Sequence, residues 1–472
     1  MHRQLSFLRA FPVFFLAVLA LTLGALPARA GAATPWSVIS DRTGGATDAP
    51  AVLRGTDGRL HVAWRDTDGA TSGLRYRVQS PLGKWTATTA ITSGWSSITN
   101  PGLTVVDNQL VAVWAGTAGA APEPRSTGRA WFAVLTDKGW ISPAEGFTES
   151  GAPTNSGSIS AAVTRDGTPW TIWNGGAGTF GAHASFLRAG TEQSLAQPGC
   201  CQDHANVARD VKTGDVQAVY HSNEPGNSGI FRRRLAPEAG APVRLVGGGT
   251  SAAGVLRHAR MSIAARTSGG IYTAYCDTSS CARIRVTGTD GKTLTIVHPG
   301  TRPVAVDSVG VSPAPNGRLW VHWGDGSSMW AARSNTAFTK WGATVKLGLP
   351  IGTKGSPWYA AADGTKGSLD IIANITAGTS LRLWHRRALP GLSVTGKTTI
   401  LPSSRLRKVT LTIHDAGVGV RGLVRFAGVE HTTNATGVAT FIVSSAKRPG
   451  RYAVSGSAAG FSPIASTYAL RG

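Results

Sequence analysis

One pattern recurs along most of the chain: two runs of alternating apolar residues, joined by a tight turn and closed by a fixed final position. AVLRGTDGRLHVAW and VGVSPAPNGRLWVHW are clear copies. The seven copies end at Trp64, Trp114, Trp173, Tyr220, Tyr275, Trp323 and Asn374. Alternation is the period of a β-strand, and a repeat of roughly 50 residues suits one four-stranded propeller blade. The repeat therefore predicts an all-β chain folded as a β-propeller, with seven blades preferred and six possible.

The start of the chain predicts how the ring closes. TPWSVIS, residues 34–40, is an isolated strand-like run with its own tryptophan. The seventh copy has third-strand material, SLRLWHRRA, but no comparable fourth strand follows it. We expect the N-terminal run to complete blade seven, because closure removes the exposed edges that an open sheet must protect. The predicted propeller spans residues 34–388.

The pattern changes from residue 389 onward. Short alternating runs such as VTLTIHD, ATFIVSS and RYAVSGSA are separated by glycine-rich turns, and the segment is long enough for a small β-sandwich. HTTNATGVATFIV resembles a segment of bacterial immunoglobulin-like modules. We therefore expect an immunoglobulin-like β-sandwich over 389–472, for which a spacer or stabilising cap is one possible role.

The first thirty residues have the features of a secretory signal peptide. A short basic start precedes the apolar run FPVFFLAVLALTLGAL, and Ala28-Arg29-Ala30 supplies small residues around a cleavage site. The run is shorter than the roughly 20 residues that cross a bilayer. We expect residues 1–30 to be removed and the mature protein to be secreted into the extracellular medium, with no membrane span.

The formal net charge of +22 favours anionic partners. No nucleic-acid-binding motif accompanies that charge, so we expect no specific nucleic-acid partner. No metal-ligand spacing of the HExxH kind is present, so neither a metal nor a cofactor is predicted. We expect a monomer that binds carbohydrate or another anionic extracellular polymer.

The four cysteines are expected to form disulfides in an oxidising compartment. Cys276 and Cys281 flank a short turn, so local pairing is the simplest arrangement. It leaves Cys200 to pair with Cys201, whose Cα atoms would lie about 3.8 Å apart, below the usual disulfide range of about 4.4–6.8 Å. Such a bond needs a distorted peptide. Two cross-bridges between neighbouring loops are the alternative.

The repeats resemble two propeller families over roughly residues 34–388. LTDKGW and NTAFTKW fall where the sialidase-like superfamily carries Ser-x-Asp-x-Gly-x-x-Trp turns. NGRLWVHWGDGSSMW is similar to the repeat of seven-bladed sugar-binding propeller lectins. The first resemblance implies a glycoside hydrolase or polysaccharide lyase, and the second implies sugar binding. A sialidase-type catalyst needs a tyrosine activated by a glutamate, and the seven tyrosines offer no convincing pair of this kind.

Propeller ligands usually meet the mouth formed by the loops that enter the first strands and join the second strands to the third. The candidate ligand-binding residues on these loops are Asp48, Arg65, Asp66, Asn100, Asp203, His204, His221, Glu224, His258, Arg260 and Trp358. The three histidines come from blades four and five and could form an acid/base set with Asp203 or Glu224. We also expect Trp95, Trp131 and Trp330 to be exposed for stacking on sugars.

These observations lead to one preferred function and two alternatives. We expect a secreted propeller that binds carbohydrate or another anionic polymer through its mouth. A sialidase-like hydrolase or lyase would instead need paired carboxylates across the mouth. A protein-interaction scaffold would need neither those carboxylates nor stacked tryptophans.

Overall fold

The computed structural model describes most of the chain in segments. They are residues 35–40, 49–68, 71–117, 129–142, 159–175, 181–186, 192–194, 202–222, 228–245, 261–277, 281–302, 304–353, 357–378, 380–402, 406–444 and 447–470. Within these segments, no helix has the length and apolar character needed to cross a membrane.

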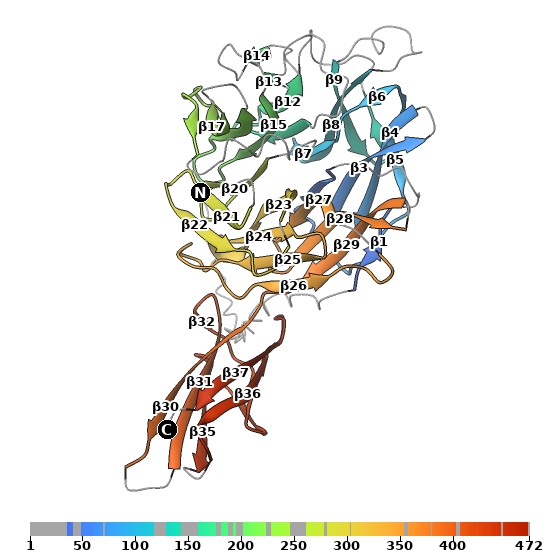
Figure 1. Cartoon of the computed structure of the whole chain (residues 1–472). Coiled ribbons are helices and arrows are strands. Elements are labelled where there is room, and N and C mark those ends of the chain that lie inside the picture. The colour runs from blue at the N-terminus through green and yellow to red at the C-terminus, as the bar shows by residue number, and fades with distance from the viewer. Residues whose placement is uncertain are drawn as a thin grey trace, which may run out of the picture.

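Seven antiparallel sheets form the first part of the molecule, each with strands in chain order from the centre of the ring outward (Figure 1). Blade 1 holds β2 (Ala51–Arg54), β3 (Leu60–Asp68), β4 (Thr71–Gln79) and β5 (Thr89–Trp95). Blade 2 holds β7 (Gly102–Val106), β8 (Gln109–Thr117), β9 (Arg129–Thr136) and β10 (Gly139–Ile141), with β6 (Ser97–Ile98) also paired to β8. Blade 3 holds β11 (Ile159–Val163), β12 (Pro169–Gly175), β13 (Gly181–Phe186) and β14 (Glu192–Ser194).

The remaining blades follow the same plan. Blade 4 holds β15 (Gln202–Arg209), β16 (Val216–Ser222), β17 (Gly229–Ala236) and β18 (Val243–Arg244). Blade 5 holds β19 (Ser262–Ala265), β20 (Ile271–Cys276), β21 (Arg283–Gly288) and β22 (Thr293–Val297). Blade 6 holds β23 (Ala305–Ala314), the turn η2 (Pro315–Gly317), β24 (Arg318–Gly324), β25 (Ser328–Arg333) and β26 (Val345–Gly348). Blade 7 holds β27 (Pro357–Asp363), β28 (Leu369–Ala377) and β29 (Ser380–Ala388).

The outer strand of blade 7 comes from the other end of the propeller sequence. The short strand β1 (Ser37–Val38) pairs antiparallel with β29, with Ser37 opposite His385 and Val38 opposite Trp384. The weak seventh repeat is therefore a true blade. Seven blades, and closure of the ring by the N-terminal run, are both confirmed.

The hydrophobic core lies between neighbouring blades. Trp64, which closes the first repeat, packs with Ile372 and Leu383 of blade 7. Trp114 of blade 2 packs edge-on against Trp95 of blade 1, with ring centroids 5.9 Å apart. The repeated aromatic position thus supplies the large apolar group that each blade presses against its neighbour.

The expectation that Trp95, Trp131 and Trp330 are exposed is wrong. All three side chains are buried. Trp131 packs edge-on against Trp95 within the core of blades 1 and 2. The Nε1 atom of Trp330 donates to the carboxylate of Asp325 at 2.8 Å. Alternating strands bury one face against the next blade, and these tryptophans lie on that face.

Two four-stranded sheets follow the propeller. One contains β30 (Ser393–Ile400), β31 (Leu406–Asp415), β32 (Val418–Gly419) and β35 (Val438–Ser444). The other contains β34 (Val429–Thr432), β33 (Leu423–Phe426), β36 (Gly450–Ser457) and β37 (Ile464–Leu470). Leu411, Phe426, Phe441 and Val454 form a core shared by both sheets. The small β-sandwich follows directly from this packing.

Candidate functional site

A cavity of about 370 Å³ runs along the axis of the propeller. Its walls come from all seven innermost strands, of which Figure 1 shows β7, β15, β23 and β27 around the centre of the ring. Each innermost strand begins at the end of the ring where the second strand of its blade finishes. We call this end the mouth, and the opposite end, where the two strands are joined by a tight turn, the floor.

Small and polar residues form one ring of the cavity near the mouth, one residue inside Pro50, Met261, Val309 and Ala360, which also line it. Each lies directly opposite the residue that precedes the closing aromatic of its blade, a position held by Ala373 in blade 7. The ring contains Ala51, Gly102, Ser160, Asn206, Ser262, Gly310 and Ala361. The next ring toward the floor is apolar and bulkier: Val52, Leu103, Ala161, Val207, Ile263, Val311 and Ala362.

Two polar side chains of this first ring are used to join blades. The Nδ2 atom of Asn206 donates to the Met261 carbonyl of blade 5 at 2.8 Å. The backbone N–H of Val311 in blade 6 donates to the Ser262 hydroxyl at 2.7 Å. Both groups are held in place by the neighbouring blade and contribute to the rigidity of the ring.

Ser160 and Asn100 are different, because their side chains are buried without a hydrogen-bond partner. Ser160, on β11, is one of the residues that line the cavity, and its hydroxyl is buried. Asn100 lies at the mouth end of blade 2, immediately before Pro101 and β7, and both atoms of its amide group are unpaired. Buried polar groups normally find a partner, so unpaired ones mark a place where a ligand or water supplies it.

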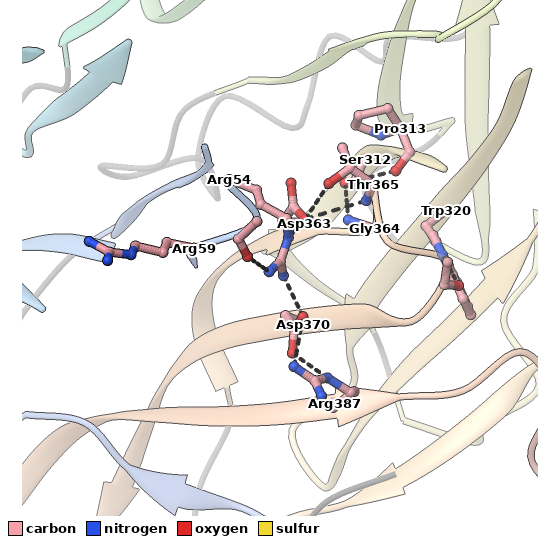
Figure 2. Close-up of polar contacts among 12 residues, drawn as sticks. Arg54, Arg59, Ser312, Pro313, Trp320, Asp363, Gly364, Thr365, Asp370 and Arg387 are labelled. Carbon is pink, nitrogen blue, oxygen red and sulfur yellow. Dashed lines mark hydrogen bonds and ion pairs between the residues drawn. The ribbon is translucent and has the colours of Figure 1, made fainter. Parts of the chain in front are cut away.

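The floor of the cavity is an ion-pair network. Arg54 of blade 1 contacts Asp363 and Asp370 of blade 7 at 2.6 and 2.5 Å. Arg387 and His385 each lie 2.9 Å from Asp370 (Figure 2 shows the arginines and both carboxylates). The two arginines and the two aspartates of this network balance each other's charge. The network therefore links blade 7 to blade 1 where the ring closes.

His322 occupies a position of the second strand at which every other blade has an apolar residue. The other blades place Ala63, Val113, Ile172, Val219, Ala274 and Ile372 at its position, all apolar. The imidazole lies over Gly310, where any Cβ atom would overlap the Nε2 atom. Burial lowers the pKa of His322 to about 4, against a hydrogen bond with the Ser308 backbone that favours the protonated form. The ring is neutral near pH 7.

We predict that His322 makes the propeller sensitive to mild acid. An unfolded histidine takes up a proton near pH 6.5, whereas the folded ring resists it until about pH 4. The stability that depends on the neutral ring is therefore present above pH 6.5 and lost as the pH falls toward 4, by about 3 kcal/mol. Denaturant unfolding of the unsubstituted protein and of His322→Leu, from pH 8 to pH 4, measures it. Parallel pH profiles of the two proteins would contradict the prediction.

Many of the candidate residues from the sequence cannot be placed. Asp48, Cys200, Cys201, Glu224, His258 and Arg260 lie outside the described residues. Asp203 and His204 lie in β15 and Trp358 lies in β27, with only their backbone described. The register places Asp203 opposite His221 across β15 and β16, so these two of the proposed acid/base set occupy neighbouring strands.

The other candidates are buried near the mouth. Arg65 donates to the carbonyl of Ile98 at 3.2 Å. The carboxylate of Asp66 is 5% exposed and lies 3.1 Å from Arg75 of the next strand. The imidazole of His221 is fully buried. Among the candidates whose side chains are described, Asn100 is buried with both atoms of its amide group unpaired.

Asp66 belongs to a repeated position. Buried aspartates also occur two residues after Tyr275 and Trp323, at Asp277 and Asp325. Asp277 lies 2.7 Å from Arg283, and Asp325 lies 3.6 Å from His298. In each blade the carboxylate meets a basic side chain where the second strand leads to the third. Because the same pairing recurs in three blades, we interpret these aspartates as residues that shape the connection between the second and third strands.

Cys276 and Cys281 form a disulfide across this same connection in blade 5. The local pairing expected from the sequence is thereby confirmed. The described residues contain no group of three or more histidine, cysteine or acidic side chains arranged to hold a metal ion.

Comparison with known proteins gives similarity at the level of structure. No family model and no curated protein matches the sequence. The BP39L lectin of Burkholderia pseudomallei matches at 13% identity and a TM-score of 0.48, over 72% of this chain and 96% of its own. The six-bladed lectin of Aleuria aurantia matches at 15% and 0.38, over 73% and 93%. The polysaccharide lyase Uly1 matches at 8% and 0.42, over 74% and 93%. Such remote similarity assigns no activity.

Proposed function

We propose that the propeller is a carbohydrate-binding module and that a saccharide enters the mouth end of the axial cavity. The observation that carries the proposal is a pair of buried polar side chains without partners: Ser160, which lines the cavity, and Asn100, whose backbone carbonyl accepts from the adjacent Ile159. A hydroxyl and a carboxamide together offer donors and acceptors. Sugar hydroxyls both donate and accept, so a saccharide could complete the hydrogen bonding of both residues. The small residues of the first ring leave room for it.

Binding, without cleavage, is the function that the described lining residues support. Asp363 is the one carboxylate among them, and Arg54 occupies it at 2.6 Å. Glycoside hydrolysis generally uses two carboxyl groups, one on each side of the scissile bond. We further propose that the protein acts outside the cell, as the signal-like segment suggests, and that its net charge of +22 directs it toward acidic polymers.

A glycan and polysaccharide panel tests the mouth site. Purified protein is incubated with each member and assayed for retained complex and, by mass spectrometry, for cleaved product. For a glycan that binds, we expect Ser160→Ala and Asn100→Ala each to weaken binding about 3- to 10-fold, the value of one neutral hydrogen bond. Ser93→Ala removes an exposed hydroxyl from β5 of blade 1 and serves as the matched control.

Two results would overturn the proposal. Unchanged affinity in both variants, with a retained glycan, would place the saccharide elsewhere on the molecule. Cleaved product from the unsubstituted protein would make it an enzyme. Thermal melts of each variant confirm that a lost affinity does not reflect a lost fold.

A further inference from the structure

Two arginines from neighbouring blades, Arg232 and Arg285, lie on the facing surfaces where the outer halves of blades 4 and 5 meet, and we call this seam the groove. Arg232 lies on β17 opposite Val219, and Val219 belongs to the core formed with blade 5. Arg285 lies on β21 opposite Tyr275. The Tyr275 hydroxyl is within electrostatic reach of both guanidinium groups. The two side chains therefore approach the same tyrosine from opposite walls of the groove.

Among the described residues, neither arginine has an acidic partner. Within that part of the chain neither side chain forms a hydrogen bond or ion pair, and the Nη1 atom of Arg232 and the Nε atom of Arg285 are buried without a partner. Two arginines elsewhere in the propeller show the contrasting arrangement: Arg54 pairs with Asp363, and Arg75 pairs with Asp66. A desolvated cation without a counterion is costly. Burial accordingly lowers the pKa of Arg232.

Nearby acids are already used. Asp290, the acid that acts on Arg232, accepts a hydrogen bond from the Tyr272 hydroxyl at 2.9 Å and lies 3.6 Å from Lys292. Asp277, which acts on Tyr275, is 2.7 Å from Arg283. No acidic side chain in the described part of the chain is therefore left to match the positive charge of the groove, and an anionic ligand could do so.

The rest of the groove suits a sugar ring. Tyr275 and Thr287 are hydrogen-bonded at 3.0 Å, and Thr287 is bonded to Thr293 at 3.1 Å, which gives a row of hydroxyls on one wall. The register puts Val297 on the same face of blade 5 as Arg285, and Val243 on the same face of blade 4 as Arg232. These valines are 66% and 53% exposed, so the outer entrance has an apolar lip on each side.

We propose that this groove binds the anionic group of an acidic saccharide, a carboxylate or a sulfate, with Arg232 and Arg285 as its donors. Guanidinium groups hydrogen-bond such oxyanions in a planar, often bidentate geometry. The threonine hydroxyls bond the sugar hydroxyls, and the two valines cover the apolar edge of the ring. The groove is separate from the axial cavity and stands on its own contacts.

Isothermal titration of the full chain tests the groove. The probes are tetragalacturonate, a sulfated galactose oligomer and a neutral galactose oligomer of equal length. We expect an acidic probe to bind and the neutral one to bind at least 10-fold more weakly. In the double variant Arg232→Gln/Arg285→Gln, the affinity for the acidic probe should fall about 100-fold or more, since one charge-assisted hydrogen bond from each guanidinium is lost.

The matched control is Arg234→Gln/Arg244→Gln, which removes the same charge from exposed positions of blade 4. We expect it to change affinity less than 3-fold. Equal losses in both double variants would reduce the effect to general electrostatic attraction and overturn the proposal, as would no loss in the first. The stronger of the two acidic probes identifies the carboxylate or the sulfate as the group recognised.

Two further variants keep the result interpretable. Arg232→Lys/Arg285→Lys retains the charge and should recover only part of the affinity, because ammonium groups lack the planar fork. Ser160→Ala should leave binding of the acidic probe in the groove unchanged. An acidic probe that depends on Ser160 and not on the arginines would refute the groove and support the mouth.

Discussion

Asp370→Asn is expected to lower the free energy of unfolding of the propeller by about 3–5 kcal/mol, because it removes the carboxylate that three basic side chains share. Asp370 is 1% exposed and lies within 2.9 Å of Arg54, His385 and Arg387. Asparagine keeps the shape but carries no charge. Arg387 would lose this carboxylate, and Arg54 would keep Asp363 and the Gly58 carbonyl.

The position of this network in the ring increases its importance. Arg54 belongs to β2 of blade 1, whereas the acids belong to β27 and β28 of blade 7 (Figure 2). The joint is the one place where consecutive blades are not consecutive in sequence. The two-residue strand β1 is the other link across it. Loss of the ion pairs leaves the ring fastened there mainly by Trp64 and its apolar neighbours.

The same substitution should change the response to acid. Burial by itself raises the pKa of Asp370, but the hydrogen bond from His385 and the charge of Arg387 outweigh it and lower the pKa. The unfolded carboxyl, with a pKa of about 3.9, is protonated first as the pH falls. Stability from this group is thus present above that value and lost below it, as the pH falls through the folded pKa. The variant should lack this loss.

Denaturant unfolding at pH 7 and pH 3.5 measures both effects. Asp57→Asn is the control, because the Asp57–Arg59 pair spans 3.4 Å on the surface with both side chains more than half exposed. It should cost less than about 1 kcal/mol. A cost for Asp370→Asn no larger than that of the control would show that the floor network does not hold the ring closed.

The propeller could be predicted from the sequence because the first two strands of each blade are adjacent in the chain and have a local sequence pattern. A tight turn and an aromatic position in six of the seven copies are enough to place two strands each. The seventh copy has Ala373 where the aromatic of the sixth copy, Trp323, stands. The prediction of a seventh blade therefore depended on TPWSVIS supplying its missing fourth strand. That pairing joins residues far apart in the sequence, and the structure contains it.

The candidate site was harder to predict, because it depends on which side chains lose their partners after folding. Asn100 was found from its place on an entry loop, but its unpaired amide is visible only in the structure. Ser160 and Arg232 carry no local signal, since serine and arginine are common on strands. His322 did carry one: it interrupts a position that is apolar in the other blades. Exposure of tryptophans was misjudged because a propeller buries both faces of its sheets.

Asp415→Asn is expected to loosen the contact between the propeller and the C-terminal sandwich. Asp415, at the end of β31, pairs with Arg318 and lies 2.6 Å from Arg333, both from blade 6. It is 2% exposed. Burial lowers the pKa of Arg333, and the charge of Asp415 opposes that shift. Breaking a buried pair of this kind costs about 3–5 kcal/mol, here taken mostly from the interface between the two parts.

The remaining contacts between the two parts are weaker. Arg333 lies over the rings of Trp320 in blade 6 and Phe461 in the sandwich, with centroid distances of 5.6 and 5.7 Å. A backbone bridge joins Ala343 to Gly391. Cation–π contacts are worth about 0.5–2 kcal/mol each and depend on a guanidinium held in place. Without Asp415, Arg333 is free to turn toward water, and these contacts weaken together.

Differential scanning calorimetry measures this coupling. In the unsubstituted protein the two parts should unfold in one transition, or in two close together, because the interface stabilises both. In Asp415→Asn the sandwich should unfold at a clearly lower temperature than the propeller. Glu430→Gln removes an exposed carboxylate from the same sandwich and should leave the transitions unchanged. An unaltered calorimetric profile in Asp415→Asn would mean that the two parts are joined mainly by their apolar and backbone contacts.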